Sequence, residues 1–315
     1  MQRVFRLALA ADGLALLTLV LGSWTRINGA GLTCPDWPLC HGHLIPSMGD
    51  GTQWEWTHRL LASALSLAIV ALIAIAWKHR KRSPFIAPTI WAIATLFVAQ
   101  VVLGAETVRL GNTPISVVLH WGTAMALIAT LSAMAVFARA TESASPLRAG
   151  TGAATVVALG VTTVAAFLTM CVGAYVSSSG AGLACLSIPG CAGTVVVYTA
   201  GQSVQMLHRI DAALTLLCAV TAFALAWARP ASAKTRVAAS IGMALICVQV
   251  VLGLLNVALR LPVDLREAHA INASLAFIAF FVATVFAMLD GVSRVAPQMT
   301  TNGASFDKLR MTSSG

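Results

Sequence analysis

The sequence predicts an all-α polytopic membrane protein whose eight transmembrane helices form two pseudo-symmetric four-helix bundles. Its 315 residues are 58% hydrophobic and only 10% charged, which exceeds what a soluble domain of this size needs. Eight stretches have about the 20 apolar residues that a helix needs to cross a bilayer, and the second half of the chain repeats motifs of the first. Short alternating segments, which a membrane β-barrel needs, are absent from the sequence. The expected helices cover residues 5–25, 57–77, 85–105, 115–138, 153–176, 205–228, 236–258 and 268–290.

The first apolar stretch follows Arg3 and Arg6, as the apolar core of a signal peptide follows its basic segment. However, the stretch is long, no small-residue cleavage pattern follows it, and the fifth stretch is its counterpart in the repeat. We therefore expect it to be retained as a helix.

The net charge of +9 follows the positive-inside rule. Most lysines and arginines fall in segments on the side of both chain ends, which predicts a cell membrane protein with both termini cytoplasmic. This distribution argues against a nucleic-acid partner and leaves membrane lipid as the surrounding partner. Residues 293–315 are polar, and we expect a disordered cytoplasmic tail. The expected outer side keeps Arg26, Arg59, Arg109, Arg209, Arg260 and Arg266.

The internal repeat extends over most of the chain. Cys34 and Cys40 recur 151 positions later, His58-Arg59-Leu60 recurs after 150, and both QVVLG (from Gln100) and His120 recur after 149. We expect a half at 1–145 and a half at 146–292, each with four helices. Because four is even, both halves enter the membrane from the same side, so a pseudo-two-fold axis should lie along the membrane normal.

Four of the seven histidines lie inside predicted helices and match pairwise across the repeat: His58 with His208, and His120 with His269. One buried histidine can simply bond a neighbouring helix, but four matched ionisable residues in a membrane indicate function. All four fall near the outer start of their helices. Two histidines per half fit the axial ligands of a haem iron, whereas zinc needs three or four protein ligands. His41, His43 and His79 are interpreted as solvated loop residues.

The two halves differ beside the first histidine of each pair. Glu55 precedes His58 by three positions and shares its helix face, whereas Gln205 stands at the matching place in the second half. Glutamine cannot ionise, so we expect chemistry in the first half, with Glu55 as its acid/base or electrostatic group, and a permanent cofactor in the second. The alternative for Glu55 is an interfacial ion pair with an arginine such as Arg26.

Arg59 and Arg209 directly follow the histidines, and two interpretations are open for them. Each arginine either binds a haem propionate or places its charge at the membrane surface.

The cysteine loops GAGLTCPDWPLC (from Gly29) and GAGLACLSIPGC (from Gly180) each lie directly before a histidine helix. Cys34/Cys40 and Cys185/Cys191 lie on the outer side, where disulfides persist. A structural bridge is one interpretation. The other is a redox role, because exposed disulfides can be labile, and we expect that role in the first half.

TRINGAGLTCPDWPLCHG (Thr25 to Gly42), with WEWTHRLLA and the four membrane histidines, resembles the heme A synthase family over residues 5–290. The resemblance implies an oxidoreductase that converts the C8 methyl group of haem O to a formyl group by successive hydroxylations, with water as the oxygen source. It implies haem b on His208 and His269, haem O as substrate between His58 and His120, an essential Glu55, and a cysteine pair matching Cys34 and Cys40. It further implies haem A supply to cytochrome oxidase, with haem O synthase and oxidase assembly factors as partners.

Two other functions stay open at this point. A di-haem b electron-transfer protein needs only the four histidines, and Glu55 with the Cys34/Cys40 loop argues against it. A transporter usually has broken helices at the bilayer midplane, whereas the polar residues here cluster at the outer helix ends. The electron acceptor and the oligomeric state, including a homo-oligomer, are left open.

Overall fold

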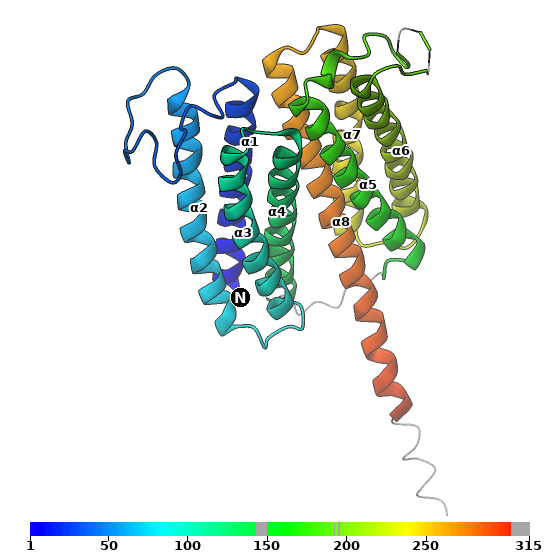
Figure 1. Ribbon diagram of the computed structural model, residues 1–315. Coiled ribbons are helices and arrows are strands. Elements are labelled where there is room, and N and C mark those ends of the chain that lie inside the picture. The colour runs from blue at the N-terminus through cyan, green and yellow to red at the C-terminus, as the bar shows by residue number, and fades with distance from the viewer. Residues whose placement is uncertain (143–149, 192, 195, 304–315) are drawn as a thin grey trace, which may run out of the picture.

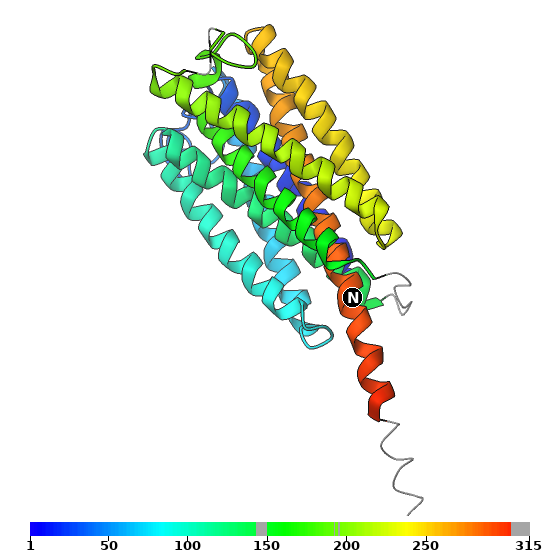
Figure 2. The ribbon, with the colours of Figure 1, turned by 90° about the vertical axis from the view of Figure 1, so that its right-hand side faces the viewer.

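The computed structural model describes residues 1–142, 150–191, 193–194 and 196–303, with side chains as far as Asp290. It contains eight long helices that run side by side in both views (Figures 1 and 2). All eight are long and apolar enough to cross a membrane, which confirms the predicted polytopic all-α class among the described residues. They are α1 (Gln2–Ile27), α2 (Thr52–Lys78), α3 (Ile86–Arg109), α4 (Pro114–Glu142), α5 (Ala153–Ser178), α6 (Ala200–Ala228), α7 (Ala233–Ala258) and α8 (Val263–Gly303), with a short 3-10 helix at Ala181–Leu183.

Several helices begin earlier than the hydropathy indicates. α2, α6 and α8 each start five residues ahead of their predicted first residue, in segments that mix polar and apolar residues. Local signals set two of these starts: Gly51 has φ 89° directly before α2, and the Thr199 hydroxyl accepts a hydrogen bond from the Gln202 amide as the N-cap of α6. The residues added to α2 include Glu55, whereas Gln205 is the first residue of the predicted sixth helix.

The last helix continues to Gly303, so residues 293–303, which were expected to be disordered, are helical here. In Figures 1 and 2 this part of α8 extends beyond the ends of the other helices. Residues 304–315, the rest of the expected tail, lie outside the described part of the chain.

The two halves use the same order of helix contacts. In the first half α1 packs on α2 and α4, and α3 packs on α4; in the second half α5 packs on α6 and α8, and α7 packs on α8. The predicted two-fold relation between the halves stays a prediction, although this shared order of contacts agrees with it.

Helices α4 and α8 join the halves. α4 contacts α5 and α8, and α8 also contacts α1. The larger buried cluster reflects this, because Ala166, Met170 and Phe277 of the second half pack into the core of the first. The core of the first half therefore extends into the second half, which also has a buried cluster of its own around Phe280.

Two polar contacts also connect α1 to the second half, near the end of the bundle that carries the cysteine loops. The Ser23 hydroxyl donates to Glu267 Oε2 on α8 at 2.8 Å, and Arg26 donates to the Ser177 hydroxyl on α5 at 3.2 Å. Both cysteine loops lie at this end of the molecule, whereas the N-terminus and the extension of α8 lie at the other (Figure 1).

Candidate functional site

The four helix histidines lie at a similar level of the bundle. His58, His120 and His269 are about two turns from the first residue of α2, α4 and α8, and His208 is about two and a half turns into α6. The start of each of these helices is at the end of the bundle that carries the cysteine loops. The structure therefore places all four as the repeat predicts.

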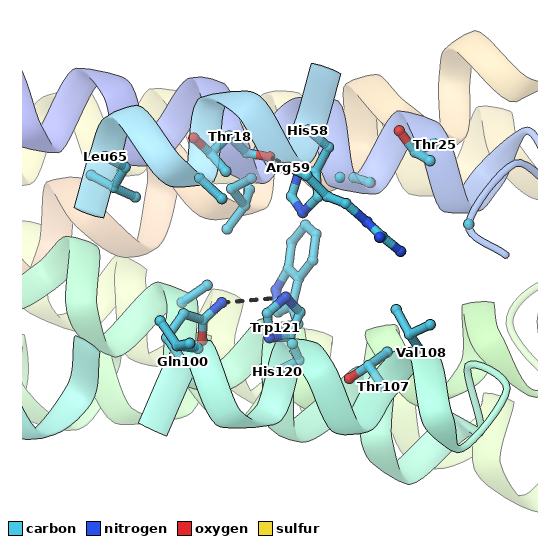
Figure 3. Close-up of a pocket in the computed structure, with 18 of the residues that line it drawn as sticks. Thr18, Thr25, His58, Arg59, Leu65, Gln100, Thr107, Val108, His120 and Trp121 are labelled. Atoms are coloured by element: carbon cyan, nitrogen blue, oxygen red, sulfur yellow. Dashed lines mark hydrogen bonds between the residues drawn. The ribbon is translucent and has the colours of Figure 1, made fainter. Parts of the chain in front are cut away.

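His58 and His120 face the same cavity, of about 310 Å³, between the helices of the first half. Figure 3 shows them pointing toward one another from opposite sides, with the indole of Trp121 beside them. Glu55 and Arg59 also line this cavity, so four of the predicted site residues meet there. Cys34 and Cys40 are not among its lining residues, but their loop is, through Trp37 and Pro38.

His208 and His269 face each other in the second half. Their ring centroids are 6.5 Å apart, with an angle of 77° between the ring planes. Two imidazoles that bind one metal ion from opposite sides, with bonds of about 2 Å, have centroids roughly 6 Å apart. The pair therefore fits a haem iron between the rings. Among the described residues, no group of three or more His, Cys, Asp or Glu side chains is placed to hold a metal ion.

Polar groups on neighbouring helices contact three of the four rings. His58 Nδ1 lies 3.0 Å from the carbonyl oxygen of Thr18, which as an acceptor would leave Nε2 free to bind a metal. The side-chain nitrogen of Gln100 lies 3.4 Å from His120 Nε2, and that of Gln249 lies 3.1 and 3.2 Å from the two ring nitrogens of His269. Gln100 and Gln249 are the first residues of the two QVVLG motifs.

Glu55 is buried and binds the first cysteine loop. Its Oε2 accepts hydrogen bonds from the Thr33 hydroxyl and the Cys34 amide, both at 3.0 Å, and its Oε1 accepts from Arg59 at 2.6 Å. The expected alternative partner, Arg26, is thus replaced by Arg59. The carboxylate has room for about four donors, so one acceptor position remains on Oε1.

Gln205 makes the matching contact in the second half. Its Oε1 accepts from the Cys185 amide at 2.5 Å, and its amide nitrogen donates to the Gly182 carbonyl at 2.7 Å. Both side chains therefore accept from the amide of the first cysteine of their loop, whereas the two halves differ at this position in charge and in the second partner, which is Arg59 for Glu55 and the Gly182 carbonyl for Gln205.

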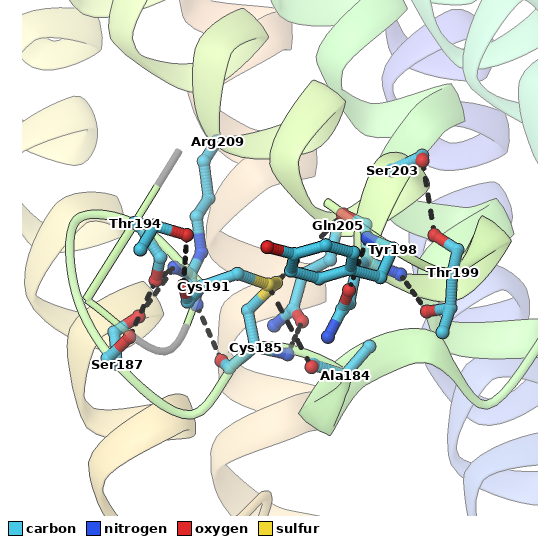
Figure 4. The surroundings of a disulfide bond; sticks show 12 residues. Ala184, Cys185, Ser187, Cys191, Thr194, Tyr198, Thr199, Ser203, Gln205 and Arg209 are labelled. Carbon is cyan, nitrogen blue, oxygen red and sulfur yellow. Dashed lines mark hydrogen bonds between the residues drawn. A yellow bond between two sulfur atoms is a disulfide. The ribbon is translucent and has the colours of Figure 1, made fainter. Parts of the chain in front are cut away.

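Arg59 and Arg209 reach into the cysteine loops and bind backbone carbonyls. Arg59 donates to the carbonyls of Asp36, Leu39 and Cys34 at 2.5–2.9 Å. Figure 4 shows Arg209 approaching the second loop from α6, and its guanidinium donates to four carbonyls at 2.7–3.1 Å: those of Cys185, Ser187, Pro189 and Gly190. Neither of the two expected roles describes this contact, and propionate binding stays a prediction.

Both cysteine pairs form disulfides, with Cα–Cα distances of 4.6 Å. The expectation that these bridges are exposed is wrong, because all four cysteines are at most 2% exposed within their loops. A reductant would therefore reach the sulfur atoms only after the loop has moved.

The loops differ at a second matched position. Asp36 accepts from the amides of His41 and Gly42 at 2.6 and 2.8 Å. The Gly42 bond, with smaller contributions from His41 and Arg59, holds the pKa of Asp36 below its ordinary value of 3.8. Its counterpart, Ser187, accepts from the amide of Gly193 at 3.0 Å with a hydroxyl that does not ionise.

Several residues near the two sites were not predicted. Glu267 is 5% exposed, and its Oε1 has no hydrogen-bond partner among the described residues. It lies two positions before His269 but has no counterpart in the first half, where Val118 stands, so the repeat carried no signal for it. Gln100 and Gln249 did carry a signal, since each opens a QVVLG copy, whereas Trp37 and Trp121 did not stand out.

Comparison with known proteins shows to which family the chain belongs. The sequence profile of the COX15-CtaA family, described as cytochrome oxidase assembly protein, matches residues 5–281. A protein named heme A synthase from Bacillus pumilus is 29% identical over 87% of this chain and 89% of its own length. Proteins of the same name from Bacillus licheniformis and Shewanella oneidensis are 27% and 26% identical, over 87% and 86% of this chain and 89% and 92% of their own lengths. The matched residues reach into all eight helices and include both histidine pairs and both cysteine loops, and the chain belongs to the COX15-CtaA family of cytochrome oxidase assembly proteins.

Proposed function

We propose that this chain is a heme A synthase, which oxidises the C8 methyl group of haem O to a formyl group and thereby supplies haem A to cytochrome oxidase. The relatives that carry this name span nearly the whole chain. The observation that carries the proposal in the structure is the cavity between His58 and His120, with the buried carboxylate of Glu55 in its wall.

The proposed reaction balances with one water molecule as the oxygen source. Methyl plus water gives formyl, four protons and four electrons. The oxygen enters in two successive hydroxylations, each of which releases two protons and two electrons, and the resulting geminal diol loses one water. The protein must therefore accept protons beside the methyl group, and an external electron acceptor must take the electrons.

The residues of the first half would supply the proton acceptor beside the methyl group. His58 and His120 hold haem O from its two sides, and the Cys34 amide, the Thr33 hydroxyl and Arg59 hold the Glu55 carboxylate in place. Electron removal from the methyl group develops positive charge, which a fixed carboxylate stabilises. The free acceptor position on Oε1 then takes a proton from the attacking water.

The second half fits a resident haem b. His208 and His269 would hold its iron, and Gln249 would orient His269. When bound, haem b supplies a one-electron carrier close to the substrate site. Gln205 and Arg209 hold the adjoining loop, and the uncharged Gln205 stands where the first half has Glu55, so this position supplies no proton acceptor in the second half.

The finer assignments rest on the same geometry. We infer that Cys34 and Cys40 support turnover through their loop, which covers the substrate cavity with Trp37 and Pro38. We also infer that both termini face the cytoplasm, which places the two haem sites near the outer face of the cell membrane. Haem O synthase and oxidase assembly factors are the partners that would deliver the substrate and receive the product.

Pigment analysis tests the proposal. Membranes that contain this chain and a supply of haem O are extracted, and their haems are separated and identified. New haem A, absent from membranes with the Glu55→Gln variant, is the expected result. Bound haem b without haem A would instead support a di-haem electron-transfer protein, and membranes without bound haem would support a transporter.

A further inference from the structure

Each of the four helix histidines lies against a glycine of the preceding helix. A Cβ atom added to Gly22 would lie 2.6 Å from Cε1 of His58, and one added to Gly173 would lie 2.9 Å from Cε1 of His208. The corresponding distances are 3.0 Å from Gly104 to His120 and 3.3 Å from Gly253 to His269. In every pair the same edge of the ring, Cε1 and Nδ1, faces the glycine.

These glycines follow the internal repeat. Gly22 and Gly173 are 151 positions apart, as the matched cysteines are, and Gly104 and Gly253 are 149 apart, as His120 and His269 are. Gly104 and Gly253 are the last residues of the two QVVLG motifs. The repeat therefore retains the glycine, the histidine and the distance between them.

A polar group lies one helical turn before three of these glycines and contacts the same ring. Thr18, four positions before Gly22, places its carbonyl oxygen 3.0 Å from His58 Nδ1. Gln100 and Gln249, four positions before Gly104 and Gly253, contact His120 and His269 through their side chains. Each of these rings therefore spans about one turn of the neighbouring helix. The glycine contacts the ring at one end of that turn, and the polar group contacts it at the other end.

Other helix glycines show that this arrangement is not a general feature of the bundle. Gly13 on α1 has no atom within 4 Å of its added Cβ, and Gly160 on α5 has only a methyl carbon of Thr284 at 3.9 Å. Gly242 on α7 faces a ring, but the ring is that of Phe280, at 2.9 Å. Glycine destabilises a helix interior relative to alanine, so its presence opposite each histidine calls for a compensating role.

We propose that Gly22, Gly104, Gly173 and Gly253 are positioning residues that set the place and rotation of the four imidazoles relative to the haem irons. A methyl group at any of them displaces the ring and with it the nitrogen that binds the metal. The inference rests on the proposed function only in taking these histidines as haem ligands.

The full-length protein, purified in detergent, provides the test in the second half. Gly173→Ala is compared with Gly160→Ala on the same helix and with Gly242→Ala, whose added methyl meets a ring at the same 2.9 Å. The readouts are haem b content per chain, the low-spin bis-histidine absorption and electron paramagnetic resonance signals, and thermal unfolding of the protein. Loss of a group that orients a metal ligand weakens metal binding about 10- to 100-fold.

We expect Gly173→Ala to retain haem b about ten-fold more weakly, or to shift its low-spin signal, while the helices stay folded. Gly160→Ala should leave haem content and signal unchanged, and Gly242→Ala should lower thermal stability without changing the signal. Equal haem content and an unaltered signal in Gly173→Ala would overturn the inference. So would an equal shift in Gly242→Ala, because the effect would then be one of packing.

A second comparison applies to the first half and does not use turnover. The Gly22→Ala and Gly13→Ala variants, both changed on α1, are each titrated with haem O. Binding is followed by absorption spectroscopy. Weaker binding in Gly22→Ala alone supports the inference, whereas equal binding contradicts it. A wild-type chain that forms no haem A but shows the bis-histidine signal would overturn the proposed function and leave this comparison valid. A wild-type chain that binds no haem would overturn both the proposed function and the inference about the glycines.

Discussion

At the scale of the single residue, Glu55 and Gln205 differ by one ionisable group in equivalent surroundings. Each accepts a hydrogen bond from the amide of the first cysteine in its loop. The second half thus shows that glutamine supports this kind of loop, which makes Glu55→Gln a substitution that removes the charge and keeps the contact to Cys34.

For Glu55→Gln we expect turnover of haem O to fall by about 10²- to 10⁴-fold, the usual contribution of a general acid or base. The absorption of the haem held by His208 and His269 should stay unchanged, because that pair lies in the other half. Measurement of haem A formed per chain, in protein with full haem b content, checks this. Unchanged turnover would remove Glu55 from the chemistry.

Asp36 gives the first cysteine loop a dependence on pH that the second loop lacks. Its pKa is lowered in the folded protein, so its contribution to loop stability is present above its unfolded value of 3.8 and is lost as the pH falls through the lower folded value. Below that pH we expect a phosphine reductant to open the Cys34–Cys40 disulfide several-fold faster.

The Cys185–Cys191 disulfide is the internal control, because the hydroxyl of Ser187 stands where Asp36 does and does not titrate there. Asp36→Ser should make the two disulfides alike in their response to pH. If the opening rate of the Cys34–Cys40 disulfide in the wild-type protein depends on pH no more than that of Cys185–Cys191, down to pH values below the folded pKa of Asp36, then Asp36 does not stabilise its loop.

At this scale the sequence predicted where the candidate residues lie better than it predicted what they touch. The repeat located the four histidines, and the difference between Glu55 and Gln205 identified the half with the carboxylate. The arginine contacts were not predictable in this way, because the carbonyls that bind Arg59 and Arg209 belong to the backbone. Their positions depend on how the loop folds and not on which side chains it carries.

At the scale of the element, each cysteine loop is attached to the helix that follows it by an arginine and by a glutamate or a glutamine. The first loop also lines the proposed substrate cavity, through Trp37 and Pro38. A change in the conformation of this loop therefore also moves Glu55 and the wall of the cavity. A change in the second loop moves Gln205, whose side chain is an uncharged amide.

Replacement of Cys34 and Cys40 by serine should accordingly reduce haem A formation more than replacement of Cys185 and Cys191. A loss of about 2–5 kcal/mol is typical when a native disulfide is removed, so thermal unfolding is measured beside activity for both variants. Comparable stability with unequal activity is the expected result. Equal losses of activity, or a larger loss from the second pair, would contradict it.

Helix positions were predicted well within the apolar stretches and poorly at their starts. Hydropathy identifies the part of a helix that lipid surrounds, whereas the first turns of α2 and α6 are polar and are set by local groups such as the Thr199 cap. The first turns of α2 carry Glu55, which is why the predicted second helix began after the residue on which the proposed chemistry depends.

At the scale of the whole molecule, the two halves meet through the shared apolar core and through the contact between Ser23 and Glu267. The Glu267 carboxylate is buried, and the Ser23 hydroxyl is its hydrogen-bond donor among the described residues. Loss of that donor leaves a buried acceptor unsatisfied.

We expect Ser23→Ala to lower the free energy of unfolding by about 1–3 kcal/mol, the usual effect of leaving a buried polar group without a partner. Ser274→Ala is the matched control, because Ser274 is also buried but bonds only the Ala270 carbonyl within its own helix. Thermal unfolding of both variants in the same detergent checks this. A smaller effect of Ser23→Ala than of the control would show that the contact does not stabilise the junction between the halves.

The hydrogen bond from Arg26 to Ser177 joins two positions that are 151 residues apart, the same interval that separates the matched cysteines. This position therefore meets its own copy. In an assembly of two identical four-helix chains, arginine here would face arginine, and the like charges would repel, whereas serine would face serine without a charge. Within one chain the two copies of this position can carry different residues. A donor, Arg26, can then pair with an acceptor, Ser177, which an assembly of identical chains does not allow.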